Sequence, residues 1–73
     1  EVESAIARLE GLFPEVEAAF AGSDFGKDAL SRAQNVIGVS REAVSRGDIH
    51  RMREQLEALE RARRGLAGML GKP

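Results

Sequence analysis

The chain has 73 residues and a formal net charge of −1, with eleven basic and twelve acidic residues. A chain this short forms one domain and buries only about 60% of its unfolded surface, so we expect modest stability. The absence of cysteine excludes a disulfide framework or a thiolate metal site and fits a cytoplasmic location. Because charges of both signs are interspersed and no long apolar run occurs, neither nucleic acid nor a membrane is predicted as a partner.

The first predicted helix keeps a single apolar seam although two helix-breaking residues interrupt it. Its apolar residues recur at steps of three and four, which is the period of one helix face. Gly11 and Pro14 lie within the segment, and proline removes a helical hydrogen bond. We therefore predict a kink or short break around 12–13, with Pro14 in a first turn. The seam comprises Val2, Ile6, Leu9, Phe13, Val16 and Phe20.

The second helix is predicted to span about residues 27–45 and to follow a loop of small and polar residues at 21–26. Ser23 or Asp24 is expected to cap it. Gly38 lies in its interior, where glycine costs about 1 kcal/mol relative to alanine. Either another helix packs closely against Gly38 or the helix is locally weak there, and of the two we expect close packing. The apolar face comprises Leu30, Ala33, Ile37 and Val44, widened by Ala29, Val36 and Ala43.

The segment from 48 to 70 has the strongest helical pattern in the chain. Gly47 suits the left-handed position that ends a helix, and Asp48 can accept a hydrogen bond from the first turn of the next helix. These residues predict a tight corner between antiparallel helices. Glu57 and Glu60 each precede an arginine by four residues, an order that favours ion pairs. The apolar seam comprises Ile49, Met52, Leu56, Leu59, Leu66 and Leu70.

Basic residues gather towards the end of this third helix, at Arg61, Arg63 and Arg64. They could meet an acidic partner, or they could complement the negative end of the helix dipole. Arg63 interrupts the apolar seam. The methylene groups of Arg63 can lie along the apolar surface so that its guanidinium group reaches solvent, or Arg63 can pair with Glu10 or Glu17 of the first helix.

Three amphipathic helices with short connections and no strand pattern predict an all-α fold. We expect an antiparallel three-helix bundle with one shared core, in which the first helix is kinked or broken near Pro14. The chain begins at Glu1 and not at a methionine. We interpret residues 1–73 as a single helical-bundle domain from a larger protein.

The residues show no pattern for catalysis, a metal or a cofactor. His50 is the single histidine and has no ligand partners at metal-binding spacing, so we expect it at the surface. The five serines, including Ser40, lack an activating base and are interpreted as caps and helix-surface residues. All-helical chorismate mutases have a helix patterned like residues 53–61, but the other cations here lack the spacing of that site. We therefore predict a protein that is not an enzyme.

Three consecutive features carry a family resemblance in the second half of the chain: the helix end 41–44, the turn 45–48 and the apolar helix that follows. Together they resemble the C-terminal helical lid subdomain of DnaK-type heat-shock chaperones. In that family a short Gly-Asp or Gly-Asn corner precedes the last long helix of the bundle. The resemblance implies a non-catalytic lid that covers a peptide held by a neighbouring domain and slows its release.

The alternative function is a helical dimerisation or adaptor module that mediates protein–protein interaction. Apolar surface left outside the shared core would favour this alternative. Leu12, Phe25 and Val39 lie off the main seams and are candidates for such surface, although Phe25 can also fold back onto the core near its turn. Under either function the partner is a protein or peptide, and self-association is one option.

Overall fold

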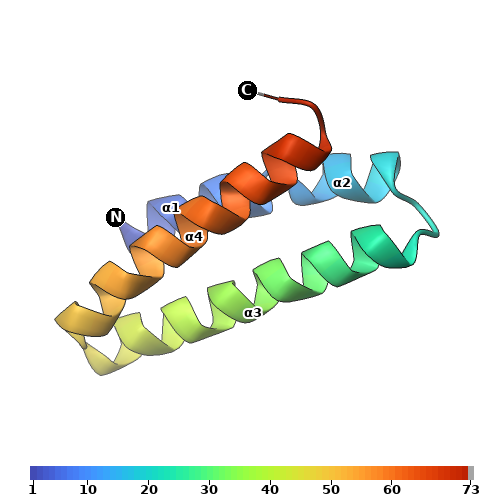
Figure 1. Ribbon diagram of the computed structural model, residues 1–73. Coiled ribbons are helices and arrows are strands. Elements are labelled where there is room, and N and C mark those ends of the chain that lie inside the picture. The colour runs from blue at the N-terminus through green and yellow to red at the C-terminus, as the bar shows by residue number, and fades with distance from the viewer. Residues whose placement is uncertain (73) are drawn as a thin grey trace.

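The computed structural model describes residues 1–72, which form four helices: α1 (Val2–Glu10), α2 (Phe13–Ala19), α3 (Asp24–Arg46) and α4 (Ile49–Met69) (Figure 1). No strand occurs among these residues, so the predicted all-helical class is confirmed. α3 and α4 run antiparallel and pack against each other, and α1 packs on both (Figure 1). The Cα atoms extend over 37 × 23 × 14 Å, so the bundle is only about two helices thick.

α1 and α2 form one arm that is interrupted at Gly11 and Leu12. The backbone of these two residues stays in the right-handed helical region, with φ of −61° and −87°. The two helices therefore continue in nearly the same direction (Figure 1). Pro14 lies in the first turn of α2, where its missing N–H removes no helical hydrogen bond. The expected interruption near Pro14 is present. The apolar residues before and after it stay on the same face of the arm. The buried residues of the arm are Val2, Ala5, Ile6, Leu9 and Val16.

A close backbone approach occurs where the chain begins α3. This helix begins at Asp24, earlier than expected, with Ser23 at the N-cap position, although the Ser23 side chain makes no capping hydrogen bond. Gly26 therefore lies in the first turn of α3 and not in the loop, and it is buried against Phe20. A Cβ atom on Gly26 would lie 2.5 Å from the Cβ and 3.1 Å from the carbonyl oxygen of Phe20. The contact leaves no room for a side chain at this position.

The corner between α3 and α4 has the predicted geometry. Gly47 has a φ of 67°, in the left-handed region that glycine adopts without strain. Its N–H donates to the carbonyl of Val44, and the N–H of Asp48 donates to the carbonyl of Ala43, both at 3.1 Å. The Asp48 carboxylate accepts a hydrogen bond from the backbone N–H of Arg51 at 3.0 Å. The corner thus ends α3, caps α4 and folds α4 back along α3.

The arm, α3 and α4 share one core, and two residues lie elsewhere than the sequence predicted. Ile49, assigned to the seam of α4, is 63% exposed because it is the first residue of that helix, at the corner end of the bundle. Ser40, expected on a helix surface, is fully buried. Its hydroxyl donates to the carbonyl of Val36 at 2.7 Å, so burial leaves no unpaired polar group.

Gly38 does not have the close neighbour that the sequence pattern predicted. It is exposed on α3, and a Cβ atom there would meet no other atom within 4 Å. The prediction was wrong because a low helix propensity does not specify what packs against the residue. The close approach occurs at Gly26 instead.

Replacing Gly38 with alanine is expected to raise the free energy of unfolding by about 1 kcal/mol. Alanine restricts the unfolded chain and has the higher helix propensity, and its methyl group meets open space. For a domain of this size the change corresponds to a Tm increase of about 4–8 °C. Thermal unfolding followed by circular dichroism measures it, and an unchanged or lower Tm would contradict the open surroundings of Gly38.

Candidate functional site

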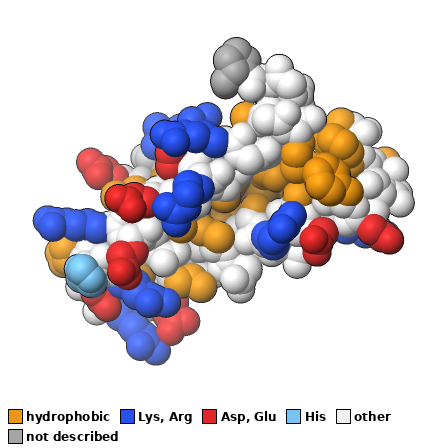
Figure 2. Space-filling view, viewed as in Figure 1, with side chains coloured by type: hydrophobic (Ala, Val, Ile, Leu, Met, Phe, Trp, Pro, Cys, Tyr) orange, Lys and Arg blue, Asp and Glu red, His pale blue; other side chains and the backbone are white. Residues whose placement is uncertain are grey.

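An open apolar groove runs between α3 and α4, and it is lined by residues of these two helices only. Its volume is about 470 Å³. Figure 2 shows apolar side chains gathered between the two helices, with basic and acidic side chains around them. We call this surface the α3/α4 groove. α3 contributes Phe25, Ala29, Arg32, Ala33 and Val36, and α4 contributes Ala58, Arg61, Ala62, Gly65, Leu66 and Met69.

Small residues form the floor of the α3/α4 groove. Ala29 and Ala33 are one turn apart on α3, and Ala58, Ala62 and Gly65 follow one another at helical steps on α4. A Cβ atom on Gly65 would meet no other atom within 4 Å, so the space above this residue is open. The floor is therefore apolar, and its side chains are short, so that the backbone of another helix can approach it closely.

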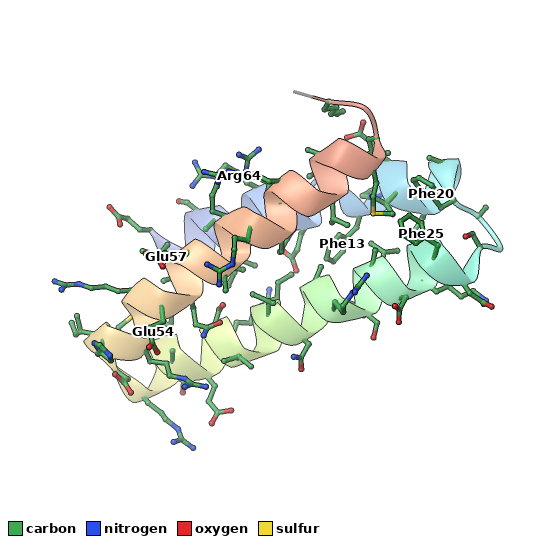
Figure 3. All side chains as sticks on the ribbon, in the orientation of Figure 1. Phe13, Phe20, Phe25, Glu54, Glu57 and Arg64 are labelled. Carbon is green, nitrogen blue, oxygen red and sulfur yellow. The ribbon has the colours of Figure 1, made fainter. Side chains whose placement is uncertain are left out.

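Aromatic side chains lie at the α2–α3 end of the bundle. Phe25 is 58% exposed, and its ring centroid lies 5.8 Å from that of Phe20 in an edge-on arrangement (Figure 3). Phe25 is therefore exposed apolar surface. This agrees with the expectation that it lies outside the shared core, and not with the expectation that it folds back onto the core. Leu12 and Val39 were the other candidates, but both are half-buried and neither lines the α3/α4 groove. Leu12 packs against the core because it joins the two helices of the arm.

Two arginines flank the groove, one on each helix. Arg32 Nη2 lies 3.8 Å from Asp28 Oδ2, and both side chains are highly exposed, so this ion pair contributes little. Arg61 has no carboxylate of residues 1–72 within ion-pair distance, so its predicted pair with Glu57 is absent. No acidic residue lines the α3/α4 groove. The two charged side chains that line the groove are therefore both basic.

The other two arginines of the predicted basic cluster pair within α4. Arg63 Nε donates to Glu60 Oε1 at 3.1 Å, and Arg63 Nη2 donates to Glu60 Oε2. Hydrogen bonding to Arg63 is the main cause that lowers the pKa of Glu60. Arg64 Nε lies 3.4 Å from Glu60 Oε2, which confirms that predicted pair. Of the two expectations for Arg63, pairing with a carboxylate of the first helix is wrong, because Glu60 lies one turn away on the same helix and takes that role. Glu10 pairs with Arg41 instead, at 3.3 Å.

His50 lies on the surface, away from the groove. Its Nε2 is 3.7 Å from Glu54 Oε2, and its side chain is 88% exposed. Within residues 1–72, no group of three or more His, Cys, Asp or Glu is placed to hold a metal ion. The same residues include no helix with the length and apolar character needed to cross a membrane.

The chemistry of the α3/α4 groove is set by apolar and cationic side chains. Its lining consists of alanine, glycine, larger apolar residues and two arginines, without a hydroxyl, thiol, imidazole or carboxylate. An apolar floor with flanking cations can bury apolar side chains and pair with carboxylates at its edges.

Comparisons with known proteins do not assign a family. The chain matches no family model, and searches of curated proteins and of solved structures found no match. The resemblance to the chaperone lid therefore stays a prediction.

The sequence does contain a signal for this groove, which the single-seam interpretation of α4 overlooked. Ala58, Ala62 and Gly65 repeat at helical steps beside the leucine seam and form a second apolar stripe. Arg61 lies on the edge of that stripe, whereas Arg63 lies within the leucine seam and pairs with Glu60. The leucine seam packs into the shared core, and the second stripe lines the α3/α4 groove.

Proposed function

We propose that this protein is a non-catalytic helical interaction module that binds an α-helix of a partner protein in the α3/α4 groove. The observation that supports this proposal best is the groove itself, about 470 Å³ in volume, apolar, and continuous with the exposed Phe25. Apolar surface of this kind is typical of a site that another protein covers. The proposal corresponds to the adaptor alternative from the sequence.

The shape of the groove favours a helix as its occupant. Two antiparallel helices present parallel walls, and a third helix packs between them by placing its side-chain ridges in their grooves. The lining of α4 runs from Ala58 to Met69, a rise of about 16 Å. This length accommodates about three turns of a partner helix, with apolar anchors one turn apart.

A designed amphipathic peptide, with leucine on one face and glutamine on the other, tests the proposal. Its addition should shift the amide NMR signals of residues 25–36 and 58–69 and leave those of α1 unchanged. Gly65→Gln should weaken binding at least about tenfold, because the new side chain fills the open space above Gly65.

Gly38→Gln is the matched control for this experiment. Gly38 is also an exposed helical glycine with open space around it, but helical periodicity places it on the face of α3 opposite the groove. Its replacement should change the affinity by less than about twofold. Equal weakening by both substitutions, or shifts spread evenly over the chain, would rule out the α3/α4 groove as the binding surface.

A DnaK-type lid is the second candidate, and the corner at Gly47 and Asp48 supports it. There a helix with an apolar residue near its end turns at a Gly-Asp pair and leads into the last long helix. In this role the bundle covers a peptide bound by a neighbouring domain of the same cytoplasmic protein. The sequence of the parent chain tests this candidate. An ATPase domain and a β-rich domain before Glu1 would support it, and a receptor, kinase or scaffold neighbour would contradict it.

A further inference from the structure

We infer that the occupant of the α3/α4 groove is an acidic amphipathic helix of a different protein. This inference rests on the proposed function. It adds that the partner helix is acidic and that it belongs to a different protein. The positions of the charged residues around the groove carry it.

Arg32 and Arg61 lie at about the same level on opposite walls of the groove. α3 and α4 run antiparallel (Figure 1). Phe25 near the start of α3 and Met69 at the end of α4 therefore lie at one end of the groove, and the α3–α4 corner lies beyond the other. Arg32 follows Phe25 by about two turns, and Arg61 precedes Met69 by about two turns. A helix in the groove therefore passes between the two guanidinium groups, and carboxylates on both of its flanks would meet them.

The opposite side of α3 and α4 already packs against an acidic helical arm. Residues 1–20 contain five glutamates and one arginine, whereas the rest of the chain contains seven acidic and ten basic residues. Glu10 pairs with Arg41 at 3.3 Å, and Glu15 pairs with Lys72 at 2.7 Å. α3, α4 and Lys72 thus form a basic platform that holds an acidic amphipathic arm on one face. Its open face combines the same features, an apolar floor and flanking cations.

A second copy of this chain does not suit the groove. Pairing two grooves about a two-fold axis would bring the arginines at 32 and 61 of one copy towards those of the other, and like charges oppose association. The acidic arm of a second copy is not free to bind, because its apolar residues Val2, Ile6 and Leu9 are buried in their own core. The charges therefore favour a different protein.

Three helical peptides with the same leucine face, flanked by glutamate, glutamine or lysine, test the inference. By isothermal titration calorimetry, the glutamate peptide should bind at least about tenfold more tightly than the lysine peptide, with the glutamine peptide between them. The difference should shrink in about 0.5 M salt, because the flanking charges are exposed and screened.

Charge reversal identifies the arginines responsible. The double variant Arg32→Glu/Arg61→Glu should reverse the order, so that the lysine peptide binds most tightly. Arg46→Glu/Arg53→Glu is the matched control, because it changes the same charge on the same two helices at exposed positions outside the groove. This control should keep the preference for glutamate, and circular dichroism shows whether each variant is folded.

The outcomes distinguish this inference from the proposed function. If the three peptides bind equally and Gly65→Gln weakens all of them, the acidic partner is wrong but the groove remains a protein-binding site. If no peptide binds, both proposals fail. If light scattering shows a dimer that Gly65→Gln dissociates, the occupant is a second copy and the inference is overturned.

Discussion

Replacing Leu59 with alanine should lower the free energy of unfolding by about 3 kcal/mol, within the range of about 2–5 kcal/mol for leucine truncation in a core. Leu59 is 1% exposed and belongs to the same cluster as Leu9 of α1 and Ile37 of α3. Truncation removes buried apolar atoms and leaves a cavity where the arm, α3 and α4 meet. The helices cannot all move inward to fill it, because each is also held by its other contacts.

A loss of this size is a large part of the free energy of unfolding, which is expected to be about 4–11 kcal/mol for a domain of this length. Denaturant titration followed by circular dichroism measures the difference. Ile49→Ala is the matched control, because it truncates an apolar residue of the same helix that is 63% exposed. It should change the free energy by less than about 0.5 kcal/mol. Similar losses at both positions would show that α4 is rotated relative to the core described here.

Replacing Gly26 with alanine should lower the free energy of unfolding by about 1–3 kcal/mol, although alanine usually stabilises a helix. The new Cβ would lie 2.5 Å from the Cβ of Phe20, far inside van der Waals contact. That atom is bonded directly to the backbone, so a change of rotamer cannot move it away. Relief therefore requires the end of α2 and the first turn of α3 to separate.

Gly38→Ala makes the same chemical change in the same helix, but it is expected to raise the free energy of unfolding, whereas Gly26→Ala is expected to lower it. The alanine at 38 meets no atom within 4 Å and should stabilise, whereas the alanine at 26 meets Phe20 and should destabilise. Thermal unfolding of the two variants side by side makes the comparison. A stabilising effect at both positions would mean that α2 and α3 do not approach as closely as the contact at Gly26 requires.

Several features follow from the sequence because they depend on neighbouring residues within one element. The period of the apolar residues in 2–20 keeps its phase across Gly11 and Pro14, since a proline in a first turn leaves the helix direction nearly unchanged. Gly47 and Asp48 specify the corner through a left-handed φ and a side-chain cap. These rules need no knowledge of what lies across the bundle.

Other features depend on which helix lies beside a residue, and periodicity does not contain that information. Gly26 and Gly38 have the same propensity, yet one is in contact with Phe20 and the other is open. Ile49 belongs to the same seam as Leu59 but lies beyond the covering helices.

The sequence by itself thus determined an all-helical chain, its apolar seams and its α3–α4 corner. Only the tertiary structure decided that the arm covers one side of α3 and α4 and leaves the α3/α4 groove open. The same packing leaves Arg61 at the edge of the groove while Arg63 pairs with Glu60. The physical reason is that backbone geometry sets which residues share a helix face, whereas the number and placement of neighbouring helices set which faces are buried.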